Sequence, residues 1–310
     1  MPSPVALFVY NRADNTRRTL QALLANTLAS QTELYVFSDG GKDEASWAAV
    51  REVRGVLHEV EAEVARTRSL LKMTIVERPE NYYLERNIIE GIAQVFEQHD
   101  TIIVLEDDIV TSPHFLQFMN DAFSVYRDEP RVMHISGFTR LSTLNPHPST
   151  YFSPFMAGWG WGTWRDRWQT YFHHYQSRAE ALAGLAQEDL NALEYGGVFP
   201  CLKHLDRQPI PWDICWGIAI HRAQGLCLYP SRTLVQNIGL DSGTHYHGFP
   251  IPTHWIQHYD YDRPPYEGAI AVTYAEPRID PQVEAAMKTA LTDWGIRYTW
   301  LGRLLRWLFT

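Results

Sequence analysis

Residues 101–110 read Thr-Ile-Ile-Val-Leu-Glu-Asp-Asp-Ile-Val. The apolar run Thr101–Leu105 predicts a buried strand of a parallel sheet, and three acids follow it directly: Glu106, Asp107 and Asp108. Ligands of open α/β sheets bind beyond the carboxyl ends of the strands. Adjacent carboxylates there would repel one another and raise their own pKa values unless a cation lay among them. Mg²⁺ and Mn²⁺ bind through one or two carboxylates plus substrate phosphates. The segment therefore predicts a metal–diphosphate site, although a solvated acidic turn before a helix would give the same pattern.

The first half of the chain alternates strand and helix patterns on both sides of this segment. This order predicts an α/β fold with a mostly parallel sheet and helices on both of its faces. The expected strands are Val5–Tyr10, Leu34–Ser38, Met73–Glu77 and Arg131–Ser136; the expected helices are Asn15–Leu28, Ala45–Arg68, Leu84–Gln98 and a helix opened by Ser112-Pro113 that runs to about Tyr126.

The second half has a different character. Residues 141–154 are rich in Pro, Ser and Thr and predict a loop, and helical patterns return at Arg178–Leu193 and Asp213–Gln224. We expect one compact unit made of residues 1–140, a loop- and helix-rich part at 141–275, and a helical tail at 276–310.

Composition excludes several classes of protein. The chain has 310 residues, with 27 Lys+Arg against 36 Asp+Glu and a net charge of −9, which argues against a non-specific nucleic-acid binder. Three cysteines, Cys201, Cys215 and Cys227, form no disulfide framework and no zinc pattern, as expected for reduced thiols in a cytosolic protein. Neither a signal peptide nor an apolar run of about 18 residues is visible, so we expect a cytoplasmic protein.

Common nucleotide and hydrolase motifs are absent. The turn after the first strand is Asn11-Arg12-Ala13-Asp14, which lacks the glycines of a dinucleotide-binding fingerprint. The sequence contains neither a P-loop nor a G-x-S-x-G element. The acidic strand end therefore remains the main pointer to chemistry.

Four segments in order resemble glycosyltransferases of the GT-A type. They are similar to segments of N-acetylglucosaminyltransferase I and of bacterial family 2-like sugar transferases, and they read Ala6-Leu-Phe-Val-Tyr-Asn-Arg12, Ser38-Asp39-Gly40, Val104-Leu-Glu-Asp-Asp-Ile-Val110 and Ser112-Pro-His-Phe-Leu116. The resemblance runs through roughly the first 140 residues. It implies a Rossmann-like GT-A fold whose first part binds a nucleotide sugar. It also implies a metal-dependent, inverting transfer of a sugar from a UDP-sugar to a hydroxyl of a glycan or lipid-linked glycan. UDP-N-acetylglucosamine is the first donor to consider.

The resemblance also implies roles for residues of the first half. Asp108 would be the direct ligand of Mn²⁺ or Mg²⁺, while Glu106 and Asp107 would meet the ribose and sugar hydroxyls or support the metal through water. Asn11, Arg12 and Asp39 would frame the uridine. Arg86 could meet the diphosphate or the uridine, although an Arg at a helix start is more often part of a surface ion pair.

An inverting transferase needs a carboxylate that deprotonates the acceptor hydroxyl. Asp213, at a predicted helix start beside Trp212, resembles the Trp-Asp that carries this base in the family. Asp213 could instead be only a helix N-cap. The rival candidates for the base are Asp166, Asp206 and Asp241.

Two further segments of the second half resemble donor-site elements. Trp161, within Gly158–Trp164, would offer a flat face to the donor sugar, or it could simply pack in a core turn. Trp212, beside Asp213, is a further donor-site candidate. His245, in a polar loop, would reach the metal or the diphosphate, although a loop histidine is usually only exposed to solvent.

The C-terminal segment Trp300–Phe309 predicts a basic amphipathic helix. Such a helix suits peripheral contact with the inner face of an anionic membrane, and packing on the domain itself would give the same stripe. Two alternatives to the glycosyltransferase remain open: a non-catalytic carbohydrate-binding protein of the same fold, and a sugar nucleotidyltransferase, which normally has a Gly-rich first turn.

Overall fold

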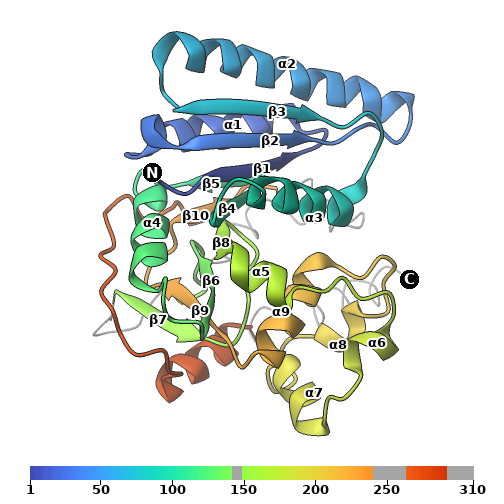
Figure 1. Ribbon diagram of the computed structural model, residues 1–310, viewed down its shortest axis with the longest axis vertical. Coiled ribbons are helices and arrows are strands. Elements are labelled where there is room, and N and C mark those ends of the chain that lie inside the picture. The colour runs from blue at the N-terminus through green and yellow to red at the C-terminus, as the bar shows by residue number, and fades with distance from the viewer. Residues whose placement is uncertain (142–148, 240–262, 292–310) are drawn as a thin grey trace, which may run out of the picture.

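The computed structural model describes residues 1–141, 149–239 and 263–291. Its main feature is an eight-stranded sheet with the strand order β3-β2-β1-β4-β8-β6-β9-β7 (Figure 1). A separate two-stranded antiparallel sheet joins β5 to β10. The strands are β1 Val5–Val9, β2 Glu33–Ser38, β3 Lys72–Glu77, β4 Thr101–Glu106, β5 Ile109–Thr111, β6 Val132–Ser136, β7 Thr150–Ser153, β8 Trp161–Trp164, β9 Leu226–Pro230 and β10 Val235–Asn237.

The N-terminal part of the sheet is parallel, as predicted. β2 pairs with β3, and β1 pairs with both β2 and β4, all in parallel. All five residues of β1 are buried, because alternate side chains point to opposite faces and both faces are covered. Leu7 belongs to one hydrophobic core, while Phe8 belongs to the other.

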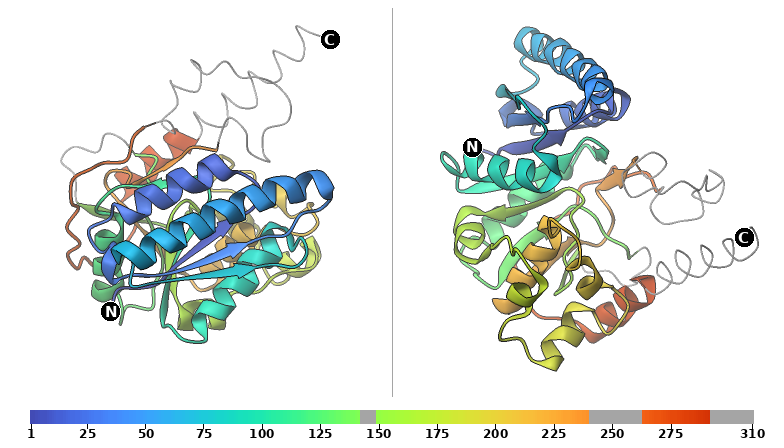
Figure 2. Two further views of the ribbon diagram at one scale, coloured as in Figure 1. Left: turned by 90° about the horizontal axis from the view of Figure 1, so that it is seen from above. Right: turned by 90° about the vertical axis from the view of Figure 1, so that its right-hand side faces the viewer.

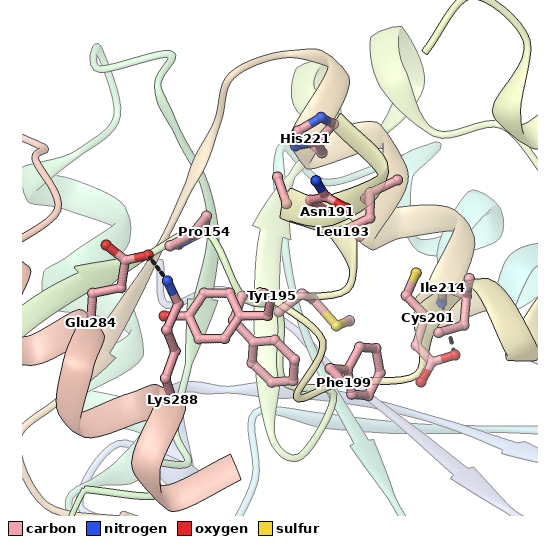
Figure 3. Close-up of a pocket in the computed structure, with 16 residues that line it drawn as sticks. Pro154, Asn191, Leu193, Tyr195, Phe199, Cys201, Ile214, His221, Glu284 and Lys288 are labelled. Carbon is pink, nitrogen blue, oxygen red and sulfur yellow. Dashed lines mark hydrogen bonds and ion pairs between the residues drawn. The ribbon is translucent and has the colours of Figure 1, made fainter. Parts of the chain in front are cut away.

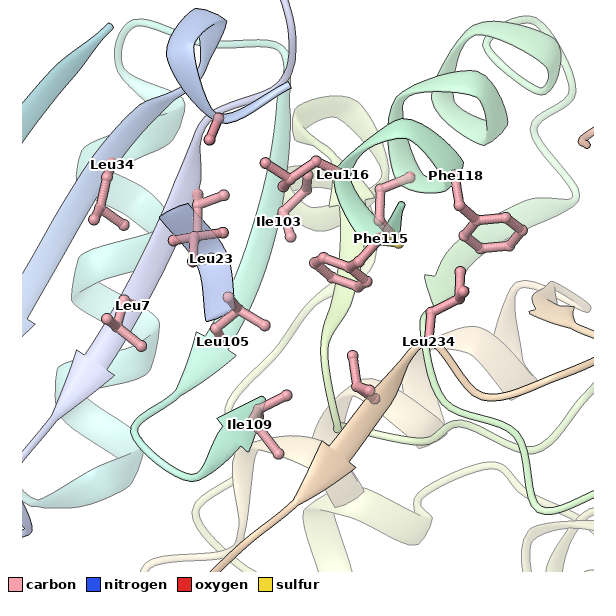
Figure 4. Close-up of a cluster of buried hydrophobic side chains, with 14 of the residues drawn as sticks. Leu7, Leu23, Leu34, Ile103, Leu105, Ile109, Phe115, Leu116, Phe118 and Leu234 are labelled. Atoms are coloured by element: carbon pink, nitrogen blue, oxygen red, sulfur yellow. The ribbon is translucent and has the colours of Figure 1, made fainter. Parts of the chain in front are cut away.

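Helices cover both faces, which confirms the predicted layers (Figure 2). One core joins β1, β2 and β4 to α1, α2 and α4, and Figure 4 shows part of it, with Leu23, Phe115 and Leu116 near Ile103 and Leu105. The other core joins the opposite face to α3 and α9. These helices are α1 Ala13–Leu24, α2 Glu44–Thr67, α3 Tyr83–Phe96, α4 Phe115–Val125 and α9 Trp212–Arg222.

The second half of the sheet departs from the expectation of a loop-rich region. β8 runs antiparallel between β4 and β6, and β7 pairs antiparallel with β9. β8 fits against β4 because Gly162 has no side chain: a Cβ there would lie 2.6 Å from the carbonyl oxygen of Ile102. The short β7 and β8 were missed because their pairing partners lie far away in the sequence.

Two predicted helices have different bounds. α4 begins at Phe115 rather than at Ser112-Pro113, because the Ser112 amide donates 2.8 Å to the Leu234 carbonyl and holds the chain extended there. The helix predicted over Arg178–Leu193 is split into α6 and α7, because Gly184 between them adopts a positive φ of 75°. The remaining helices include a 3₁₀ turn at Ala29–Gln31, α5 Arg165–Tyr171, α6 Arg178–Leu182, α7 Gln187–Leu193 and α8 Cys201–His204.

Residues 281–291 are helical and carry Val283, Met287 and Leu291 into the second core. The predicted tail helix Trp300–Phe309 lies outside the described residues. Within the part of the chain that the structure describes, no helix combines the length and the apolar character needed to cross a membrane.

Candidate functional site

The three acids lie where β4 ends, as predicted, and Arg12 lies against them. Glu106 is the last residue of β4, and Asp107 and Asp108 form the turn into β5. The Arg12 guanidinium is ion-paired with the carboxylate of Asp107 and, at 2.9 Å, with Oδ2 of Asp108. Gly239 approaches the pair so closely that a Cβ there would clash with Asp108 Oδ2 and with Arg12. Arg12 therefore lies against the acidic turn, and its expected place at the uridine stays a prediction.

The surroundings of Glu106 and Asp107 disfavour the ionised form of both carboxyl groups. Burial, followed by the charges of Asp108 and Asp107, raises the pKa of Glu106 to about 8. Burial raises the pKa of Asp107 to about 6, although Arg12 opposes this shift. Burial disfavours the charge of Arg12, but the two carboxylates outweigh it and raise the Arg12 pKa above its ordinary value. One guanidinium therefore does not fully compensate the three acids.

A hard divalent cation fits this donor set. Asp107 Oδ2 is buried and has no hydrogen-bond partner among the described residues, and Asp108 offers a second carboxylate. In residues 1–141, 149–239 and 263–291, no group of three or more His, Cys, Asp or Glu side chains is arranged to hold a metal. The pair would therefore need oxygen ligands from a substrate, which is how Mg²⁺ usually binds. His245, expected as a further ligand, lies outside the described residues.

Asp213 reaches the same site from the second half of the chain. It is the second residue of α9, whose N-cap is Pro211, so Asp213 is not the N-cap that the sequence left as an alternative. Its carboxylate accepts a 2.8 Å hydrogen bond from the Ile214 amide. Its charge contributes to the raised pKa of Glu106, so the two carboxylates lie within electrostatic range of each other. The fold thus brings the candidate base to the acidic turn.

Trp212, the residue before Asp213, belongs to a stack of three rings. Trp212 stacks on Trp161 with centroids 5.1 Å apart, and Trp161 stacks on His134 at 5.2 Å. The Nδ1 of His134 accepts from Trp216 at 3.3 Å, and its Nε2 lies 3.1 Å from the Ala157 carbonyl. Nε2 therefore carries the proton, and burial lowers the pKa of His134 to about 3. The stack holds the start of α9 against β8 and β6.

The expectation that Trp161 offers an open face to a sugar is wrong. Trp161 is fully buried on β8, and its two faces are covered by His134 and Trp212. Trp212, expected at the donor site, is also buried. The sequence could not show this, because the covering rings come from β6 and α9.

Asp39 lies at the end of β2 and is buried. Its carboxylate accepts from the Tyr82 amide at 2.7 Å, the Gly40 amide at 2.9 Å and Asn81 Nδ2 at 3.2 Å. Burial raises the pKa of Asp39 even though these bonds oppose the shift. The end of β2 is thereby joined to the loop that precedes α3.

An aromatic pair near Asp39 was not predicted from the sequence. The Nζ of Lys42 lies 5.7 Å from the ring centroid of Tyr10 and 5.0 Å from that of Tyr83. Tyr10 directly follows β1, and Lys42 follows the Gly40-Gly41 turn after β2, so both lie at the carboxyl edge of the sheet. That shared edge was the signal available in the sequence.

The remaining candidate residues are exposed on the surface or lie outside the described residues. Arg86 is exposed, is paired with Glu90 at 2.8 Å and Glu80 at 3.4 Å, and stacks on Tyr82 at 3.6 Å, which is the surface arrangement that the sequence left as an alternative. Asn11 is exposed beside Arg12. Two of the rival bases are mostly exposed and ion-paired, Asp166 with the buried Arg167 and Asp206 with the exposed Arg178. Asp241 lies outside the described residues.

A cavity of about 330 Å³ opens beside Asp213 (Figure 3). Its walls come from the start of the β7–β8 loop, from the α7–α8 region, from α9 and from the helical residues 281–291. The second half of the chain therefore contributes a cavity beside Asp213. Trp212, next to Asp213, stacks on Trp161, which pairs with Val104, two residues before Glu106.

Comparison with known proteins gives one family. The model of the GNT-I family matches residues 1–175, which is more than half of the chain. The search of curated proteins found no match.

Solved structures show only distant likeness. TarS of S. aureus, determined with UDP, is 15% identical over 48% of this chain and 38% of that chain, with a TM-score of 0.32. Another TarS structure gives 14% identity over 47% and 23%, with a TM-score of 0.31. The mannosyltransferase PcManGT from Pyrobaculum calidifontis, in complex with GDP-Man and Mn²⁺, is 12% identical over 72% and 76%, with a TM-score of 0.38. The chain thus spans well under half the length of these TarS structures.

Proposed function

Since the chain belongs to the GNT-I family and is therefore a glycosyltransferase, we propose that it is a metal-dependent, inverting enzyme that uses a UDP-sugar. The acceptor is a hydroxyl of a glycan or of a lipid-linked glycan. N-acetylglucosamine is the sugar that we would test first.

The donor would bind along the carboxyl edge of the sheet. Asp39, with Tyr10 and Tyr83 nearby, would hold the uracil end, because a carboxylate can accept from the base and the rings can cover it. Asp108 and Asp107 would hold Mn²⁺ or Mg²⁺ together with the donor phosphates, and His245 stays a candidate ligand. The bound ion would neutralise the diphosphate and stabilise it as a leaving group. Arg12 would then turn from the acids towards the phosphates.

Asp213 would act as the general base in a single displacement. Its carboxylate takes the proton from the acceptor hydroxyl while the oxygen forms a bond to the anomeric carbon. The bond from that carbon to the diphosphate oxygen breaks on the opposite face, which inverts the configuration.

The observation that supports this proposal is the link between the start of α9 and the end of β4: Trp212, next to Asp213, stacks on Trp161, which pairs with Val104, two residues before Glu106. The carboxylates come from two segments that are more than 100 residues apart in the sequence. The acids at the end of β4 suit a cation. Asp213, at the start of α9, borders the cavity. A single displacement needs the cation at the leaving diphosphate and the base on the opposite face of the reacting carbon.

The first experiment measures UDP release from a panel of UDP-sugars with Mn²⁺, Mg²⁺ or EDTA. We expect slow hydrolysis of one donor that stops with EDTA and in Asp108→Ala. Asp213→Asn should lose a factor of about 10²–10⁴ in transfer while keeping UDP binding, and Asp166→Asn is the matched control. Near-normal turnover of Asp213→Asn would remove the assigned mechanism.

Peripheral contact with the inner face of a membrane through Trp300–Phe309 is part of the proposal. Flotation with anionic liposomes, with and without the residues after Arg297, tests it. Equal flotation of the two proteins would rule this contact out.

A further inference from the structure

The cavity beside Asp213 runs along one face of α9. Asp213, Gly217 and His221 all line it and follow one another at intervals of four residues, which places them on one side of the helix. At 1.5 Å per residue the face from Asp213 to His221 is about 12 Å long. The cavity therefore extends from the proposed base over roughly two helical turns.

Gly217 keeps this face open. A Cβ at Gly217 would meet no heavy atom within 4 Å, so the glycine borders empty space rather than a neighbouring helix or strand. Glycine inside a helix costs about 1 kcal/mol relative to alanine. Because Gly217 lines the cavity, a larger side chain there would occupy space that a ligand lying against α9 could otherwise use.

The walls suit a sugar ring. Phe155, Tyr195 and Phe199 form an aromatic wall of the cavity, in which Phe155 and Tyr195 are almost fully buried and Phe199 is partly exposed. Aromatic surface of this kind packs against the C–H face of a pyranose. Lys288 and Glu284, paired at 2.9 Å, supply charged groups at another wall (Figure 3). The volume of about 330 Å³ falls at the lower end of the range of about 300–1,000 Å³ typical of small-molecule pockets.

We propose that this cavity is the acceptor subsite and that it takes the terminal pyranose of the acceptor. The ring lies against Gly217 and the aromatic wall, with one hydroxyl directed at Asp213. Glu284 and Lys288, which are paired with each other, and His221, whose Nε2 lies 3.0 Å from Asp189 Oδ1, line the space that the remaining hydroxyls would occupy. This inference rests on the proposed role of Asp213 as the base.

The test uses Gly217→Leu, which fills the cavity from α9. Gly55→Leu is the matched control, because Gly55 also lies inside a helix and a Cβ there would meet no heavy atom within 4 Å, but it is on the exposed side of α2. The probes are p-nitrophenyl glycosides of glucose, galactose, mannose and N-acetylglucosamine. Their binding to each protein is measured by saturation-transfer NMR in the presence of UDP and Mn²⁺, and metal-dependent UDP binding is measured in the same samples.

We expect at least one glycoside to bind the wild type and the Gly55→Leu protein, and to bind Gly217→Leu about tenfold more weakly or worse. UDP binding should be equal in all three. Lys288→Met, which changes the wall without filling the space, should also weaken the glycoside and covers the case in which Gly217→Leu does not fold.

Three results would overturn the inference. If the wild type binds UDP but none of the glycosides, the cavity is not a pyranose site. If Gly217→Leu and Lys288→Met both bind the glycoside as the wild type does, the sugar lies elsewhere. If the wild type shows no metal-dependent UDP binding, the proposed function itself fails and the acceptor subsite fails with it.

Discussion

Arg12 reaches from the end of β1 to the acidic turn and is the counter-ion for two carboxylates, one of them buried. Removing it by Arg12→Met leaves Asp107 uncompensated, so in EDTA we expect the free energy of unfolding to fall by about 2–4 kcal/mol. A cation can then replace the guanidinium. Added Mn²⁺ should therefore stabilise Arg12→Met more than the wild type in urea unfolding.

The matched control for this prediction is Arg17→Met. Arg17 lies on the same helix and pairs with Glu59 at 2.9 Å, but both side chains are largely exposed. Its loss should change stability by less than about 1 kcal/mol, with no response to Mn²⁺. Equal losses in the two variants would show that Arg12 does not compensate the acids.

The buried His134 should make the free energy of unfolding depend on pH. The folded protein keeps this imidazole neutral down to a pKa of about 3, whereas in the unfolded chain it takes up a proton near pH 6.5. Its contribution is therefore complete above pH 6.5 and is lost as the pH falls, by about 2 kcal/mol between pH 6.5 and 5.

The raised pKa of Glu106 acts in the opposite sense over the same range, so the measurement is the difference in free energy of unfolding between each variant and the wild type at several pH values in urea. The advantage of the wild type over His134→Gln should shrink by about 2 kcal/mol from pH 6.5 to 5, while its difference from His58→Gln, an exposed control, should not follow this course. A constant difference between the wild type and His134→Gln would contradict the assignment.

The sequence could predict the position of a residue in the fold where that position follows from a local pattern. Glu106, Asp107 and Asp108 follow a strand, and Asp213 opens a helix, so their places at the strand end and at the helix start were foreseeable. The burial of Trp161 was not foreseeable, because it depends on rings from two distant elements.

Among the elements, β8 depends most on a single residue. At Gly162 a Cβ would lie 2.6 Å from the Ile102 carbonyl oxygen and 2.7 Å from the Phe123 ring, so either β4 or α4 would have to move. We expect Gly162→Ala to lower the free energy of unfolding by about 1–3 kcal/mol. The same change at Gly55, in α2 and free of close neighbours, should raise it by about 0.4–1 kcal/mol. Urea unfolding of the two variants checks this, and stabilisation by both would contradict the packing described for β8.

Most of the strands that the sequence predicts are apolar on both faces of the sheet. β1, β2, β4 and β6 carry largely apolar, buried runs because both faces of the sheet are covered there, whereas β3 is a partly exposed edge strand. β7, β8 and β9 have four or five residues each and include Gly, Ser or Pro, so their composition resembles that of loops. Only antiparallel pairing with distant partners makes β7 and β8 strands, and that pairing has no local signature.

At the scale of the whole molecule, the sheet passes through both halves of the chain. β8, from residues 161–164, lies between β4 and β6, which belong to the first 140 residues. Residues 1–140 made alone would leave β4 and β6 without the strand that joins them, so we expect that fragment to remain unfolded or to aggregate. The predicted division at residue 140 would then separate two roles and not two folding units.

The distribution of tryptophan makes this prediction measurable in the intact chain. Trp47 is in the first half, and the other ten tryptophans follow residue 158, so fluorescence reports mainly on the second half. Far-UV circular dichroism also reports on α1, α2 and α3 of the first half. If β8 couples the halves, urea curves from the two probes should coincide in one transition. Gly162→Ala, which loosens β8, should shift both curves together to lower urea. Separate midpoints in the wild type would mean that the halves unfold independently and that β8 does not join them into one cooperative unit.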